Sequence, residues 1–69
     1  MVLTAVLIPA DEGVYVALNP ETGSTTQGVS VLEAIANLRE ATELYLEEFS
    51  IRSAGQPLVT TFKLAAAHA

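Results

Sequence analysis

Few residues of this chain carry the side chains that acid–base, nucleophilic or metal chemistry needs. His68 is the single histidine and cysteine is absent, so the sequence offers neither a histidine pair nor a thiolate metal site. Asp11 and Glu12 are adjacent carboxylates, but they fall between Pro9 and Gly13, where a turn would carry polar residues anyway. The serines and threonines stand in no nucleophile elbow, phosphate-binding glycine loop or H-E-x-x-H pattern. The sequence therefore predicts a protein that is not an enzyme and that uses no metal or other cofactor.

The charge of the chain narrows the kinds of partner to expect. Lys and Arg number 3 against 8 Asp and Glu, which gives a net charge of −5. The cations, Arg39, Arg52 and Lys63, are scattered along the sequence. Because a nucleic-acid-binding face needs several cations together, direct binding of DNA or RNA is not expected. The acidic balance either serves solubility alone or steers the chain towards a basic protein, and composition leaves both interpretations open.

The size of the chain limits the core that it can build. With 69 residues there is room for one small domain, residues 1–69, and no disulfide can support it. Hydrophobic residues make up 51% of the chain, more than so small a body can hide, which predicts a homodimer or a higher oligomer. The apolar residues 1–8 are too few to span a bilayer and resemble no targeting segment, so we expect a cytoplasmic protein without membrane attachment.

Three strands are predicted in the first half of the chain. Residues 2–8 are apolar on both faces, which is typical of a central strand, and residues 14–18 follow after the turn that ends at Gly13. A second group of turn-forming residues, 19–23, precedes residues 24–28, which are short and polar enough to form an edge strand.

A helix is predicted over residues 31–49. Ser30 and Glu33 form a capping box in which the Glu33 carboxylate would reach back to the Ser30 N–H. An apolar stripe should lie on the sheet, formed by Ile35, Leu38, Thr42, Tyr45 and Phe49. The opposite side carries Glu33, Glu40, Glu43 and Glu47. These glutamates form either a solvated face or a docking surface for a cationic partner.

Residues 58–64 contain β-branched and aromatic side chains and predict a last strand. A strand reached through a helix lies parallel to its neighbour, and the crossover is right-handed. We therefore expect an α+β fold with the order β-β-β-α-β, in which a four-stranded mixed sheet of order 3-2-1-4 carries one helix on one face. The other face would stay open, which again favours an oligomer.

Three further residues are candidates for partner contacts. Tyr15 is either an interface anchor or a residue at the edge of the core. Thr25 and Gln27 either pair with an incoming strand or form a polar, solvent-facing edge. The predicted topology also matches the first part of a ribonuclease H-like fold, but residues 2–8 hold no carboxylate for the two-metal reaction of those enzymes.

Taken together, these motifs resemble the HicB-like antitoxin family. Its small members share a turn with Pro, an acidic residue and Gly, then x-Y-V-A, a second Pro and Gly turn, T-Q-G, and a helix containing N-L-x-E-A-x-E-L-Y-L-E. The resemblance covers about residues 2–48. The matching residues are Pro9, Asp11 or Glu12, Gly13, Tyr15, Val16, Ala17, Pro20, Gly23, Thr26, Gln27, Gly28, Leu32, Glu33, Ala34, Asn37, Leu38, Glu40, Ala41, Glu43, Leu44, Tyr45, Leu46 and Glu47.

The resemblance implies a partial ribonuclease H-like fold and an antitoxin that binds a small basic HicA-type toxin, an enzyme that cleaves messenger RNA. Two features depart from the pattern: Ser24 replaces a cysteine found in many relatives, and the C-terminal DNA-binding segment of longer relatives is not present, so we expect no direct DNA binding. The alternatives are a stand-alone homo-oligomeric structural or ligand-binding protein without a toxin, and a degenerate nuclease that would depend on Asp11 and Glu12.

Overall fold

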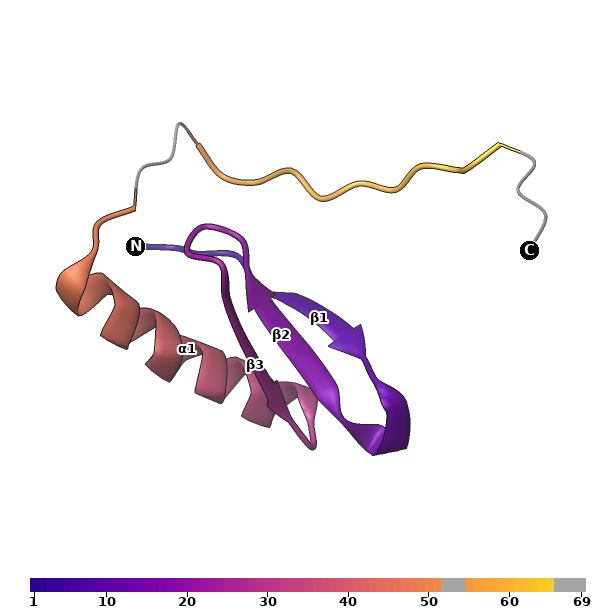
Figure 1. Ribbon diagram of the computed structural model, residues 1–69, viewed down its shortest axis with the longest axis horizontal. Helices are drawn as coiled ribbons and strands as arrows, with labels where there is room; N and C mark the ends of the chain where they lie inside the picture. Colours follow the sequence, from indigo (N-terminus) through magenta and orange to yellow (C-terminus); the bar gives the residue numbers. More distant parts are fainter. Residues whose placement is uncertain (52–54, 66–69) are drawn as a thin grey trace.

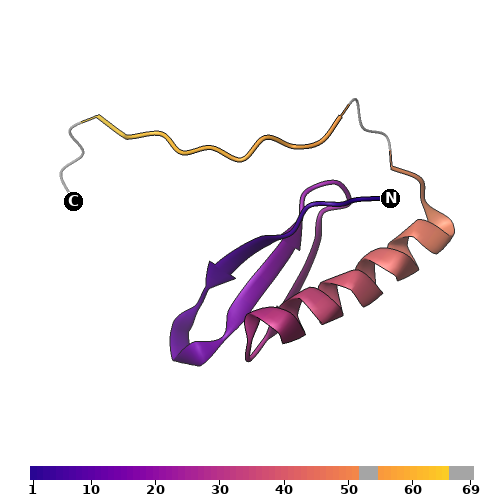
Figure 2. The ribbon, with the colours of Figure 1, turned by 180° about the vertical axis from the view of Figure 1, so that it is seen from behind.

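Three antiparallel strands and one helix form the body of the chain in the computed structural model, which describes residues 1–51 and 55–65. The strands β1 (Val6–Pro9), β2 (Tyr15–Asn19) and β3 (Ser24–Gly28) are followed by the helix α1 (Val31–Glu48) (Figure 1). A 3-10 turn, η1 (Asp11–Gly13), joins β1 to β2. The helix lies against β3 and β2 and covers one face of the sheet, a two-layer arrangement that Figure 2 shows from behind.

Two hairpins set the register of the sheet. Val6 lies opposite Leu18 and Pro9 opposite Tyr15 between β1 and β2, and Ala17 lies opposite Thr26 between β2 and β3. The first hairpin is confirmed, with β2 shifted by one residue from the predicted 14–18, and the third strand has the predicted bounds 24–28. A glycine with positive φ ends each connection, at +75° for Gly13 and +80° for Gly23, a backbone conformation that glycine adopts more readily than other residues.

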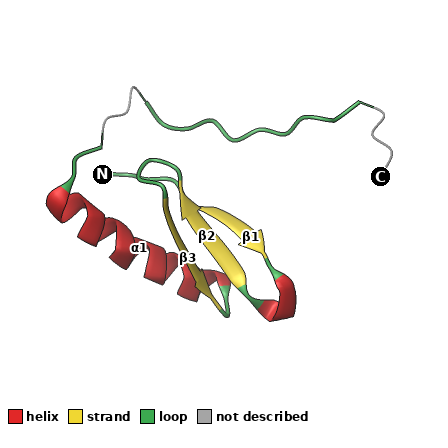
Figure 3. Ribbon diagram, viewed as in Figure 1, coloured by secondary structure: helices red, strands yellow, loops and turns green. Residues whose placement is uncertain are grey.

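The predicted fourth strand, residues 58–64, does not form. The segment runs as an extended loop clear of the sheet and the helix (Figure 3), and Leu58 and Phe62 are 87% and 85% exposed. The prediction of a four-stranded mixed sheet of order 3-2-1-4 is therefore wrong: the fold is β-β-β-α, and the sheet has the order β1-β2-β3. β-branched and aromatic residues indicate that a segment fits a half-buried sheet, but they do not bring it to a sheet edge. Because α1 covers β3 and β2, a fourth strand beside β1 would lie farther from the helix than the other strands do. It would therefore gain less burial against α1 than they gain.

The first strand is also shorter than predicted, and it is an edge strand rather than a central one. It begins at Val6 instead of residue 2. The physical reason is a polar contact that replaces strand pairing: the Thr4 N–H donates to Glu21 Oε1 at 3.0 Å, and Asn19 Nδ2 donates to the Thr4 carbonyl oxygen at 2.8 Å. The side chains of Asn19 and Glu21 therefore hydrogen-bond the Thr4 backbone groups that a longer β1 would use to pair with β2.

The helix begins where its capping residues predict. Ser30 has extended backbone angles, φ −145° and ψ 164°, and its Oγ accepts the Glu33 N–H at 3.1 Å. The Glu33 carboxylate reaches back to the N–H of Val29, at 3.4 Å, and not to that of Ser30 as expected. The box thus satisfies amide groups at the first turn that have no partner within the helix.

The core is small and lies between α1 and the middle of the sheet. Ala17, Ala34 and Leu38 are its buried apolar residues, and Leu7 and Tyr15 pack against them. Within the predicted stripe, Leu38 and Thr42 are buried and Ile35 and Tyr45 are half-buried. Phe49 differs, because the helix ends at Glu48 and Phe49 is 55% exposed, with its ring centroid 4.9 Å from that of Tyr45.

Candidate functional site

The outer side of α1 carries an acidic surface. Glu33, Glu40, Glu43 and Glu47 are all exposed along this helix. Glu33, Glu40 and Glu47 are spaced by seven residues, or nearly two turns, and so share one side of the helix, away from the buried Ala34, Leu38 and Thr42. We call these four glutamates, together with the exposed Leu44 of the same helix, the acidic helix surface.

Leu44 places an apolar side chain among these carboxylates. It lies four residues after Glu40 and three before Glu47, so it is a neighbour of both on the helix surface, and it is 59% exposed. An exposed apolar residue flanked by charged residues is the pattern of an interface centre with a polar rim. Leu44 was not among the site residues predicted from the sequence, although its position one residue before Tyr45, outside the apolar stripe, indicated its exposure.

The structure separates the other predicted contact residues from this surface. Thr25 and Gln27 are exposed on β3, and they alternate with Thr26, whose Oγ1 donates to the Ala34 carbonyl oxygen of the helix at 3.1 Å. Thr25 and Gln27 thus lie on the open face of the sheet, on the opposite side of the molecule from the acidic helix surface. Tyr15 packs against the buried cluster instead. One flat partner surface does not reach all seven predicted residues at once.

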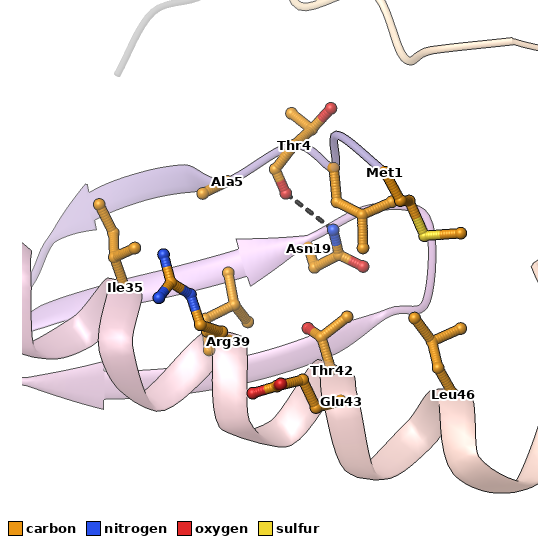
Figure 4. Close-up of a pocket in the computed structure, with 11 residues that line it drawn as sticks. Met1, Thr4, Ala5, Asn19, Ile35, Arg39, Thr42, Glu43 and Leu46 are labelled. Carbon is orange, nitrogen blue, oxygen red and sulfur yellow. Dashed lines mark hydrogen bonds between the residues drawn. The ribbon is translucent and has the colours of Figure 1, made fainter.

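A cleft of about 390 Å³ lies between the N-terminal segment and α1 (Figure 4). We call it the N-terminal cleft. Its walls come from residues 1 and 3–5 on one side and from the buried side of the helix on the other. Apolar side chains dominate the lining, and Arg39 and Glu43 contribute charge at the helix wall. Such a lining suits apolar side chains of a polypeptide better than a strongly polar molecule.

Asn19 lines this cleft from the end of β2. Its side chain is 1% exposed and fully used: Nδ2 donates to the Thr4 carbonyl oxygen and to Glu21 Oε1, at 2.8 and 2.6 Å, and Oδ1 accepts the Thr22 N–H at 2.9 Å. This residue therefore ties the N-terminal segment to the β2–β3 turn, and it fixes the shape of the cleft.

Glu21 is the one carboxyl of this junction. Partial removal from water raises its pKa, but hydrogen bonds from the Thr4 N–H and hydroxyl, from its own backbone and from Asn19 lower it more, so the pKa lies below its usual value. The charged form is therefore the one that holds Thr4 in place.

The residues considered for catalysis do not gather in one place. Asp11 and Glu12 are exposed on η1, between β1 and β2, and His68 lies outside the residues that the structure describes. Among residues 1–51 and 55–65, no three His, Asp or Glu side chains are grouped in a way that would hold a metal ion. In the same residues no helix combines the length and the hydrophobicity needed to cross a bilayer.

These observations define a small β-β-β-α protein with two distinctive surfaces, an acidic helix and an apolar cleft. No family model, curated protein or solved structure matches the chain.

Proposed function

We propose that this chain is a protein-binding module of the antitoxin type, which neutralises a small basic HicA-type toxin by covering it with the acidic helix surface. The observation that carries the proposal is the row of Glu33, Glu40 and Glu47 along one exposed side of α1, with the exposed Leu44 beside Glu40 and Glu47. Glu43 is exposed where this surface borders the N-terminal cleft. The proposal concerns binding, and it assigns no catalytic step to this chain.

The spacing of the carboxylates suits an extended basic surface. At 1.5 Å of rise per residue, Glu33 and Glu47 are about 21 Å apart along the helix axis, and Glu40 stands midway between them. Cations of a partner would meet negative charge along this whole length, which favours fast association and excludes acidic proteins. The exposed Leu44 would supply the apolar contact that charges alone lack.

The family resemblance supports the kind of partner. Glu40, Glu43, Leu44 and Glu47 all fall within the helix pattern that resembles the HicB-like antitoxins, and these same residues form most of the acidic helix surface. In that family the partner is a small basic enzyme that cleaves messenger RNA. An antitoxin with this surface would compete with the negatively charged RNA for the cations of the toxin.

The experiment is a titration of this chain into a purified HicA-type toxin taken from the neighbouring reading frame. Isothermal titration calorimetry measures Kd at low and high salt, and an RNA cleavage assay measures inhibition. We expect binding that weakens as salt rises, together with loss of cleavage. Absence of binding at low salt, with both proteins folded, would exclude the antitoxin role.

A second candidate function rests on a separate observation, the large apolar exposure of the chain. Leu58, Val59, Phe62 and Leu64 are between 68% and 87% exposed. A stand-alone homo-oligomeric protein would cover these residues with further copies of itself. A stable oligomer that neither binds nor inhibits the toxin would favour this candidate.

A further inference from the structure

The free edge of β1 and the extended segment of residues 57–64 are both without a strand partner among the described residues. β1 pairs with β2 along one edge, and among residues 1–51 and 55–65 no strand pairs with its other edge. The segment of residues 57–64, which we call the tail, runs as an extended loop clear of the sheet (Figure 1, Figure 2). An extended segment can add to an open sheet edge as a further strand. The backbone groups of the edge then form hydrogen bonds with the segment, and the neighbouring surface buries its apolar side chains.

The side chains of the tail alternate as those of a half-buried strand do. In an extended segment one side carries three apolar residues and one threonine, Leu58, Thr60, Phe62 and Leu64, and the other carries Val59, Thr61 and Lys63. The three apolar residues are 87%, 85% and 76% exposed in the single chain. The side with Leu58, Phe62 and Leu64 is therefore the more apolar of the two, and it is the side that burial against a partner would favour.

The N-terminal cleft offers a matching surface. It opens beside the N-terminal segment that leads into β1, and Leu3, Ala5, Ile35 and Leu46 give it apolar walls (Figure 4). A strand added along β1 and the residues before it would place every second side chain on the same side of the sheet as α1. Those side chains would enter the cleft.

We propose that the tail of one copy pairs with the β1 edge of a second copy and places Leu58, Phe62 and Leu64 in the N-terminal cleft of that copy. A second copy is the fitting occupant because the tail leads away from its own sheet, and because each copy carries both a tail and an open edge. The exchange is then reciprocal, and in a two-fold symmetric dimer the β1 edge and the tail of each copy are both paired. This inference concerns self-assembly and does not depend on the proposed toxin.

Cross-linking distinguishes exchange between copies from pairing within one chain. The protein has no cysteine, so every disulfide reports introduced residues. Ile8→Cys marks the open face of β1, and Val59→Cys, Thr61→Cys and Lys63→Cys mark the matching side of the tail at three registers. Chains of different tag length, one with the β1 cysteine and the other with a tail cysteine, are mixed and oxidised. We expect a mixed disulfide at one of the registers, and little with Thr60→Cys, which points to the other side.

A matched pair of tail variants provides the second measurement. Phe62→Asn removes a side chain from the proposed cleft contact, whereas Thr61→Asn changes the adjacent residue on the water-facing side. By light scattering we expect the unmodified chain at twice the 7.3 kDa chain mass. Phe62→Asn should weaken the dimer by about tenfold or more, and Thr61→Asn by less than about threefold. The lack of a mixed disulfide at every register, equal effects of the two variants, or a monomer at all concentrations would overturn the proposal.

Discussion

Gly28 and Ala34 touch so closely that a β-carbon built on Gly28 would lie 2.6 Å from the backbone nitrogen of Ala34. This contact joins the end of β3 to the first turn of α1, and it sets how the helix lies on the sheet. The nearest atoms belong to the backbone, which does not rotate away as a side chain does.

Gly28→Ala should therefore destabilise the fold, because the first turn of α1 would have to move off β3. We expect a loss of about 1 to 3 kcal/mol in the free energy of unfolding, measured by urea denaturation followed by circular dichroism. Gly13→Asn is the control, since the space around Gly13 is open and asparagine tolerates a positive φ. A Gly28→Ala variant as stable as the unmodified chain would show that the helix is not held by this contact.

Asn19→Ala tests the junction between the N-terminal segment and the β2–β3 turn. The substitution leaves the Thr4 carbonyl oxygen and the Thr22 N–H without their partner in a buried place, so we expect a loss of about 1 to 3 kcal/mol. Hydrogen exchange should accelerate at the amide of Thr4, which the junction protects. Unchanged exchange at Thr4 would contradict the role given to Asn19.

The lowered pKa of Glu21 predicts a pH dependence of stability. A carboxyl whose pKa is lower in the folded chain contributes stability above its unfolded pKa, and that contribution is lost as the pH falls through the folded value. The unmodified chain should therefore exceed Glu21→Gln in stability at pH 7. The difference should shrink below the ordinary glutamate pKa of about 4.3. Denaturation of both chains between pH 7 and 3 measures it, and a difference that grows on acidification would contradict this account.

Leu44→Ala separates binding from folding. Leu44 is largely exposed, so we expect its truncation to change the free energy of unfolding by less than about 0.5 kcal/mol. Binding to the HicA-type toxin should weaken by about tenfold or more, because the apolar centre of the acidic helix surface is lost. Calorimetry and thermal denaturation of the same preparation check both statements. A variant that binds normally would show that the contact does not include this side of α1.

Much of the fold was predictable because it depends on short-range signals. The capping box at Ser30, the glycine turns and the apolar stripe of α1 each act within a few residues, and each produced the expected element. The missing fourth strand and the short β1 depend instead on distant contacts. Strand-forming residues such as Val59 and Phe62 report only how they would fit a sheet, and the bond between Thr4 and Glu21 joins residues 17 apart in sequence.

The same contrast between short-range signals and distant contacts applies to the candidate site. Helical spacing was enough to place Glu33, Glu40 and Glu47 on one exposed side. The placement of Tyr15 in the core and of Thr25 and Gln27 on the far face follows from the strand register, which spacing within one strand does not reveal. The N-terminal cleft could not be predicted from the sequence, because its walls come from the N-terminal segment and from α1. The three strands separate these two segments along the chain.

The central claim is that the position of the acidic residues, and not merely their number, determines binding. The most direct measurement compares two variants with the same change in net charge: Glu40→Gln with Glu47→Gln on α1, and Asp11→Asn with Glu12→Gln on η1. Calorimetric titration against the HicA-type toxin at low salt gives Kd for both. The helix variant should bind about tenfold or more weakly than the unmodified chain, and the η1 variant within about threefold of it. Equal weakening of the two variants, or none in either, would contradict the account.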